Sequence, residues 1–126
     1  MFETGINMIM SSRHRLPDAA PEEREEHAHT YLVELTARGE KVNDLGYLVD
    51  IDDLKKALSA VLELYRDRCL NEMEDFSQAV PSLENLARAI WLRTSASLSR
   101  SLVTSLAVRV WEDKVAWAAY EQAVRH

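Results

Sequence analysis

Two histidines that stand one residue apart, His27 and His29, are the side chains whose spacing most clearly suggests chemistry. In a β-strand, residues i and i+2 point to the same face, so this spacing presents two imidazoles together. A third histidine, His14, can approach the same point if its segment pairs with theirs. Three imidazoles that leave one coordination position open are typical of catalytic zinc. The alternative is that all three are ordinary polar residues, because short motifs often match by chance.

Few other side chains suggest a reaction. The single cysteine, Cys69, excludes an internal disulfide and a cysteine-based metal site. Cys69 could be a nucleophile, but a small buried hydrophobic residue is the commoner role for such a cysteine. We expect no role for the terminal His126. The sequence has no glycine-rich phosphate loop, H-E-x-x-H helix, nucleophile elbow or C-x-x-C motif.

Length and composition predict one globular domain over residues 1–126. Hydrophobic residues make up 47% of the chain and charged residues 29%. The net charge is −6 and the basic residues are scattered, which disfavours nucleic acid or an anionic membrane as a partner. The N-terminus lacks the apolar core of a signal peptide, and no segment is long enough to span a membrane. We therefore expect a cytoplasmic protein.

The first half of the chain predicts two strands. Apolar residues alternate with other residues over 5–12 and again over 30–38. Between them, residues 16–26 contain two prolines and five acidic residues, a composition typical of an exposed loop. A turn at 43–46 closes the second strand.

The second half predicts two helices and two more strands. Apolar residues recur at helical spacing over 50–70 and 80–98, and Pro81-Ser82 is a typical helix start. Alternation returns over 104–112 and 115–121, with a short hairpin turn between these segments. The last segment could instead continue as a helix.

This order of elements predicts an α+β fold, in which a four-stranded antiparallel sheet carries both helices on one face. Several strands have apolar residues on both sides. We therefore expect other subunits to cover the second face of the sheet.

Six segments, in order and across nearly the whole chain, resemble the motifs of the 6-pyruvoyl tetrahydropterin synthase and 6-carboxytetrahydropterin synthase family. They read MSSRHRLP, HAHTYLVEL, GYLVDIDDLKKAL, CLNEM, VPSLENLARAIW and VRVWEDKVAWAAYE. The family's tunnelling fold, with β-β-α-α-β-β order, agrees with the elements predicted above. The resemblance implies that His14, His27 and His29 bind Zn²⁺.

The resemblance also implies a pterin-binding pocket. Glu112 matches the glutamate that accepts hydrogen bonds from the guanidine-like edge of the pterin, a task that suits a carboxylate. Ser82, Leu83 and Glu84 fall in the segment that lines this pocket. The alternatives are that Glu112 is a solvated turn residue and that Glu84 is a charge in the first turn of a helix.

The chain departs from the family in the residues that move protons. The family carries a cysteine shortly before the paired histidines, but the residues before His27 here are Glu23-Arg24-Glu25-Glu26. Arg66 and Asp67 occupy the positions of an Asp-His relay. Glu23 or Asp67 could act as the acid or base instead. Alternatively, Glu23 belongs to a solvated acidic loop and Asp67 forms a surface ion pair.

Together these features predict a zinc-dependent enzyme that acts on a reduced pterin or a similar compound by a non-standard reaction. A non-catalytic protein that binds a pterin or purine is the alternative, and the metal could have been lost with the relay. By resemblance we expect a homohexamer, a dimer of trimers, with its sites between chains.

Overall fold

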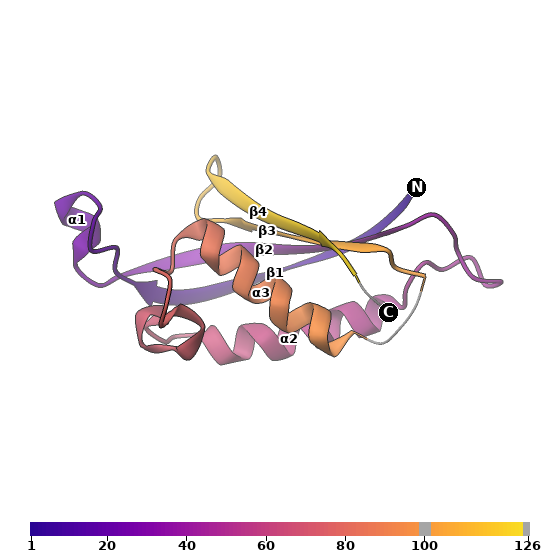
Figure 1. The fold of residues 1–126 in the computed structure, drawn as a ribbon, viewed down its shortest axis with the longest axis horizontal. Helices are drawn as coiled ribbons and strands as arrows, with labels where there is room; N and C mark the ends of the chain where they lie inside the picture. Colours follow the sequence, from indigo (N-terminus) through magenta and orange to yellow (C-terminus); the bar gives the residue numbers. More distant parts are fainter. Residues whose placement is uncertain (99–101, 125–126) are drawn as a thin grey trace.

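The computed structural model describes residues 1–98 and 102–124, which form two layers (Figure 1). One layer is a fully antiparallel sheet of four strands, and the other contains the two long helices, both on the same face. In order across the sheet, the strands are β1 (Phe2–His14), β2 (His27–Gly39), β3 (Ser105–Trp111) and β4 (Trp117–Ala123). The predicted α+β architecture is confirmed.

Both long helices begin at side chains that cap them. In α2 (Ile51–Tyr65), the Asp50 carboxylate accepts a hydrogen bond from the Asp52 N–H. In α3 (Leu83–Ser97), the Ser82 hydroxyl accepts from the Asn85 N–H, so the start predicted at Pro81-Ser82 is confirmed. These bonds satisfy N–H groups that have no partner within a helix.

The predicted end of the first long helix is wrong. The helix stops at Tyr65, because Arg66 adopts an extended conformation with a ψ of 130°, and Asp67, with a φ of 57°, turns the chain further. Two short 3₁₀ turns follow, η1 (Leu70–Glu72) and η2 (Glu74–Phe76). A further short helix, α1 (Pro21–Arg24), lies in the segment expected to be only a loop.

The core lies between the sheet and the two helices. Helix α2 packs against β1, and α3 packs against β3 and β4. The Trp91 indole N–H of α3 donates to the Leu106 carbonyl of β3 at 2.9 Å, which ties the two layers together. Fully buried aliphatic residues from β2, α2, α3 and β3 fill the space between them: Val33, Leu35, Leu54, Leu58, Leu62, Leu86, Ile90, Leu106 and Val108.

The strands β3 and β4 form the predicted hairpin. The Glu112 N–H donates to the Ala116 carbonyl at 3.1 Å, and the Asp113 carboxylate accepts from the N–H groups of Val115 and Ala116. The alternative of a final helix is therefore wrong. The turn places Glu112 directly after the last residue of β3, on the helix-covered face of the sheet, because it follows the buried Val110 by two residues.

The second face of the sheet carries an apolar cluster that no element within residues 1–98 and 102–124 covers. Ile9 is 64% exposed and Trp117 is 47% exposed, and Leu32 and Trp111 lie on the same face. The Arg109 guanidinium lies 4.0 Å from the centre of the Trp117 ring. Among the described residues, no helix has the length and apolar character needed to cross a lipid bilayer. His126 lies outside the described residues.

Candidate metal centre

The pairing of β1 with β2 brings the three histidines together. His14, the last residue of β1, lies directly opposite His27, the first residue of β2. His29 follows on the same face of β2. The ring centroids are separated by 4.5 Å for His14 and His27, 5.1 Å for His14 and His29, and 4.9 Å for His27 and His29. One ligand nitrogen from each ring lies within 4.8 Å of the other two, which is a spacing that a single metal ion can bridge.

Backbone carbonyls select the nitrogens that are free to bind. His14 Nδ1 lies 2.9 Å from the Pro81 carbonyl oxygen, and His27 Nδ1 lies 2.9 Å from the Glu25 carbonyl oxygen. Because a carbonyl only accepts hydrogen bonds, Nδ1 of each ring carries the proton and Nε2 keeps its lone pair. Both Nε2 atoms are buried, and neither has a hydrogen-bond partner among the described residues.

Burial favours the neutral form of the His14 ring. His14 is only 6% exposed, and burial lowers the pKa of its imidazole below the ordinary value, with smaller contributions from His27 and His29. A neutral imidazole is the form that binds a metal. Two orphaned Nε2 lone pairs and a third imidazole therefore fit a zinc ion with an open coordination position.

A cavity of about 250 Å³ adjoins the histidines. It holds two of them and all but one of the acidic and pocket residues predicted from the sequence. Its lining consists of His14, Leu16, Glu23, His29, Tyr31, Ser82, Leu83, Glu84 and Glu112. His27 completes the metal group from outside this lining. Three carboxylates and no lysine or arginine occur among the lining residues, which favours ligand groups that donate hydrogen bonds.

Two carboxylates of the cavity, those of Glu112 and Glu23, come from different elements. A Glu112 carboxylate oxygen at the end of β3 lies 4.0 Å from His29 Nε2. Glu23 comes from α1, where its carbonyl accepts from the Leu16 N–H at 2.8 Å and its own N–H donates to Ala20. The short helix therefore holds Glu23 at the cavity, although its composition resembles that of a solvated acidic loop.

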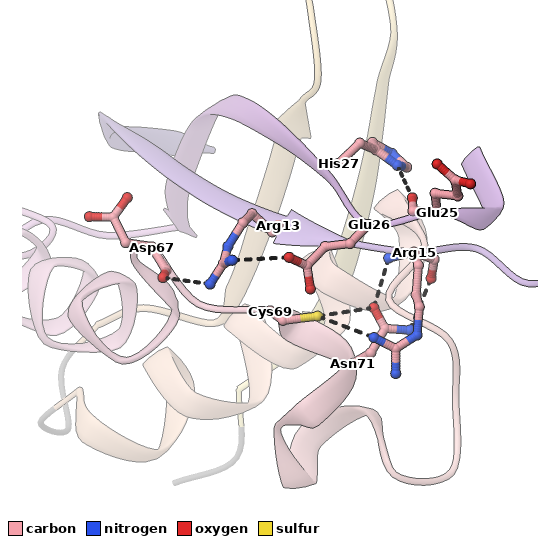
Figure 2. A network of polar contacts seen from close by, with 8 residues as sticks. All are labelled: Arg13, Arg15, Glu25, Glu26, His27, Asp67, Cys69 and Asn71. Carbon is pink, nitrogen blue, oxygen red and sulfur yellow. Dashed lines mark hydrogen bonds and ion pairs between the residues drawn. The ribbon is translucent and has the colours of Figure 1, made fainter. Parts of the chain in front are cut away.

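Asp67 and Cys69 do not line this cavity in their own chain. Figure 2 shows the backbone carbonyl of Asp67 facing Arg13, whose Nη2 lies 3.3 Å away, while the carboxylate points to the other side. Cys69 is buried, and burial together with the neighbouring Glu26 raises the pKa of its thiol. A reactive thiolate is not expected there.

Sequence reasoning missed Tyr31 as a residue of the cavity. Its side chain is 1% exposed, and its hydroxyl lies 3.5 Å from His14 Nδ1. Burial and the charge of Glu112 raise the pKa of this phenol. The signal was available, because residues 27, 29 and 31 share one face of β2, and Tyr31 is the next residue of that face after the histidines.

The fold is that of the tunnelling-fold class, and comparison with known proteins gives the family. The family model described as 6-pyruvoyl tetrahydropterin synthase matches residues 6–123. The chain is 32% identical to 6-carboxy-5,6,7,8-tetrahydropterin synthase of Bacillus subtilis, over 94% of this chain and 84% of that protein. The chain therefore belongs to the 6-pyruvoyl tetrahydropterin synthase family.

Solved structures confirm the tunnelling fold. The 6-pyruvoyl tetrahydropterin synthase of Caenorhabditis elegans superimposes with a TM-score of 0.80 at 24% identity, covering 96% of this chain and 95% of that one. A Plasmodium vivax 6-pyruvoyltetrahydropterin synthase, solved as a variant in which a catalytic glutamate is replaced by alanine, gives a TM-score of 0.79 at 16% identity and covers 98% of each chain.

Proposed function

We propose that this protein is a zinc-dependent enzyme that acts on a reduced pterin or a pterin-like compound by a non-standard reaction. The observation that carries the proposal is the pair of buried, unpartnered Nε2 atoms of His14 and His27 beside a cavity that also holds Glu23 and Glu112. Buried lone pairs without hydrogen-bond partners, beside a cavity that holds carboxylates, are costly to stability unless a ligand uses them. Membership of the family supplies the substrate class.

The residues of the chain divide the work between binding and proton transfer. Glu112 accepts hydrogen bonds from the guanidine-like edge of the pterin, as a charged acceptor with two oxygens can. The chemistry that zinc supplies when bound to His14, His27 and His29 is Lewis acidity toward the hydroxyl or carbonyl oxygens of the substrate side chain. Glu23, partly shielded at the cavity, accepts or returns the proton.

A carboxylate base is supported by what the chain lacks and by one relative. No cysteine precedes the paired histidines, so the usual pyruvoyl-forming reaction has lost its thiol. In the Plasmodium vivax relative, a catalytic residue is a glutamate. A carboxylate suits side-chain cleavage or isomerisation next to a polarised oxygen. Asp67 remains a candidate acid or base only if it reaches the cavity of a neighbouring chain.

Metal analysis tests the zinc centre. Protein purified without chelators and without a metal-binding tag should contain about one zinc per chain. His27→Ala should lose most of it, whereas His126→Ala, which removes the fourth histidine of the chain, should not. Less than about a tenth of an equivalent in the unaltered protein would defeat the three-imidazole proposal.

Product analysis tests the reaction. Incubation with dihydroneopterin triphosphate should give a cleaved or isomerised pterin, and Glu23→Gln should reduce the rate by at least about 100-fold, as is typical for loss of a general base. The matched control is Glu22→Gln, which removes an adjacent carboxylate of the same short helix that does not line the cavity. Equal losses in the two variants would refute a catalytic role for Glu23.

The alternative function is binding of a pterin or purine without turnover. The absence of the relay favours it, because Glu112 and the pocket could remain after catalysis was lost. Saturable binding that is abolished by Glu112→Gln, with no product under any condition tested, would establish this alternative.

We also propose that the protein assembles as a homohexamer, a dimer of trimers, with its sites between chains. The uncovered apolar cluster on the second face of the sheet supports assembly, as do the outer edge of β4 and the part of the β1 edge that residues 67–71 do not cover. A cytoplasmic location remains a prediction from the sequence.

A further inference from the structure

The segment after α2, residues 67–71, runs alongside the end of β1 that carries His14 (Figure 2). The Asp67 N–H donates to the Ser11 carbonyl at 2.8 Å, and the Arg13 N–H donates to the Arg68 carbonyl at 2.8 Å. The backbone of this segment therefore covers the edge of β1 next to the three histidines.

Asn71 ends this segment with two hydrogen bonds to one residue. Its side-chain oxygen accepts from the Arg15 N–H at 2.8 Å, and its side-chain amide donates to the Arg15 carbonyl at 2.9 Å. The amide therefore satisfies both polar groups of the Arg15 backbone, as a paired strand would. Arg15 directly follows His14, the proposed metal ligand. The two hydrogen bonds from Asn71 therefore hold the chain at the point where β1 ends.

The same two hydrogen bonds hold Arg15, which is the first residue of the segment that carries Glu23. Residues 15–26 leave β1 at Arg15 and return to β2 after Glu26. At the return, the Arg13 guanidinium lies 3.0 Å from the Glu26 carboxylate, and the Glu25 carbonyl accepts from His27 Nδ1. The Arg13–Glu26 ion pair at the end of the segment is exposed and contributes little to stability. The Asn71 side chain at its start is partly buried and makes two hydrogen bonds at once.

We propose that Asn71 is a positioning residue of the metal centre. Through Arg15 it sets the place of His14 relative to His27 and His29, and it fixes the start of the segment that brings Glu23 to the cavity. The proposal rests on the proposed zinc site, because it concerns the geometry with which the three imidazoles bind the ion. Groups that orient metal ligands from behind typically change metal affinity by 10–100-fold when removed.

The test compares two asparagines, at opposite ends of the molecule, whose side chains each make two hydrogen bonds to the backbone. The Asn43 side-chain oxygen accepts from the N–H groups of Leu45 and Tyr47, in the loop between β2 and α2. In Figure 1 this loop lies at the end of the molecule opposite to α1. Asn43→Ala therefore removes two hydrogen bonds between a side chain and the backbone at a place far from the three histidines.

The measurements are the zinc dissociation constant, by competition with a chromophoric chelator, and the free energy of unfolding of the zinc-free chain. We expect Asn71→Ala to weaken zinc binding by at least about 10-fold. Asn43→Ala should leave the zinc dissociation constant within about 2-fold of that of the unaltered protein, with a similar loss of stability. Equal zinc affinity in Asn71→Ala and the unaltered protein would overturn the positioning role while leaving the zinc site intact.

A second variant keeps the proposal testable if Asn71→Ala does not fold. Asn71→Asp keeps the acceptor for the Arg15 N–H, but it replaces the donor to the Arg15 carbonyl with a second oxygen and adds a negative charge. It should weaken zinc binding by about 3-fold or more, consistent with loss of one of two bonds, and unchanged affinity would again overturn the proposal. Absence of zinc binding in the unaltered protein would refute the proposed function and this inference together.

Discussion

At the residue scale, the capacity of the site depends on which nitrogen of each imidazole is already hydrogen-bonded. The backbone carbonyl oxygens of Pro81 and Glu25 face Nδ1 of His14 and His27. In each ring, Nδ1 therefore donates a hydrogen bond and Nε2 keeps a lone pair. The Nε2 lone pair of each ring is then directed to the same small volume. This selection by the backbone leaves the histidines of a common H-x-H motif, together with His14, in a form that could hold a metal ion.

A second residue-scale feature lies outside the site and has a measurable pH dependence. The Asp75 carboxylate accepts two hydrogen bonds from Arg93 and one from the Tyr65 hydroxyl, each at 2.7 Å. The Arg93 guanidinium, with a smaller contribution from Tyr65, holds the pKa of Asp75 below its ordinary value. Because the folded chain binds this proton less readily than the unfolded chain, Asp75 stabilises the fold above the ordinary pKa and loses this contribution as the pH falls through the lowered one.

Asp75→Asn should therefore lower the free energy of unfolding by about 2 kcal/mol at pH 7, as expected when bonds to a charged group are lost. The difference from the unaltered protein should shrink below about pH 4. Urea unfolding at pH 7, 5 and 3 measures this. Asp44→Asn, which removes an exposed carboxylate, is the control and should change stability by less than about 0.5 kcal/mol. A difference in free energy of unfolding between Asp75→Asn and the unaltered protein that grows toward pH 3 would contradict this role of Asp75.

At the element scale, the two long strands β1 and β2 position the site, and their far end must pack tightly to hold them. A methyl group on Gly39, the last residue of β2, would lie 2.5 Å from the Leu102 carbonyl oxygen and 2.5 Å from Leu48 Cδ1. Backbone cannot yield as a side chain can, so this glycine is required by close approach.

Gly39→Ala should lower the free energy of unfolding by about 3 kcal/mol, at the upper end of the cost of overpacking. The comparison is Gly46→Ala, at a turn with a φ of +90° and open space around it, which should cost only about 1 kcal/mol of backbone strain. Thermal or urea unfolding of the two variants measures the order. A smaller loss at Gly39 than at Gly46 would show that the Leu102 segment moves aside easily.

At the scale of the whole molecule, one chain leaves surfaces that a monomer seldom exposes. The apolar cluster of Ile9, Leu32, Trp111 and Trp117 lies on the open face of the sheet. Within the described chain the outer edge of β4 has no strand partner, and residues 67–71 cover only the end of the β1 edge. Assembly into a closed ring would remove both the edges and the open face from water.

Light scattering should therefore give a mass near six times 14.4 kDa, about 86 kDa. Ile9→Lys places a charge on the uncovered cluster and should shift the mass toward smaller species. Leu64→Lys alters an exposed leucine of α2, on the side of the molecule away from this cluster, and should leave the mass unchanged. A monomer for the unaltered protein would refute the proposed assembly.

Local patterns in the sequence were enough to predict the order of strands and helices and the antiparallel α+β sheet. Alternation and helical spacing are properties of neighbouring residues, so they can be read without knowing the fold. The shared face of His27 and His29 also followed, because residues i and i+2 of a strand point to one side. The approach of His14 could be predicted only on the condition that its segment pairs with theirs, which the structure shows. The end of α2, the short helix α1 and the place of Glu23 did not follow from such patterns.

Only the tertiary structure decided which groups complete the centre. The Pro81 carbonyl behind His14, the Asn71 side chain on Arg15 and the turn of the chain at Asp67 each join segments that lie more than 50 residues apart in sequence. Hydrogen-bond partners of this kind leave no periodic signal, because they depend on how the finished layers pack. The sequence by itself determined the residues able to bind a metal, and the packing of α3 and residues 67–71 against β1 decided how those residues are held.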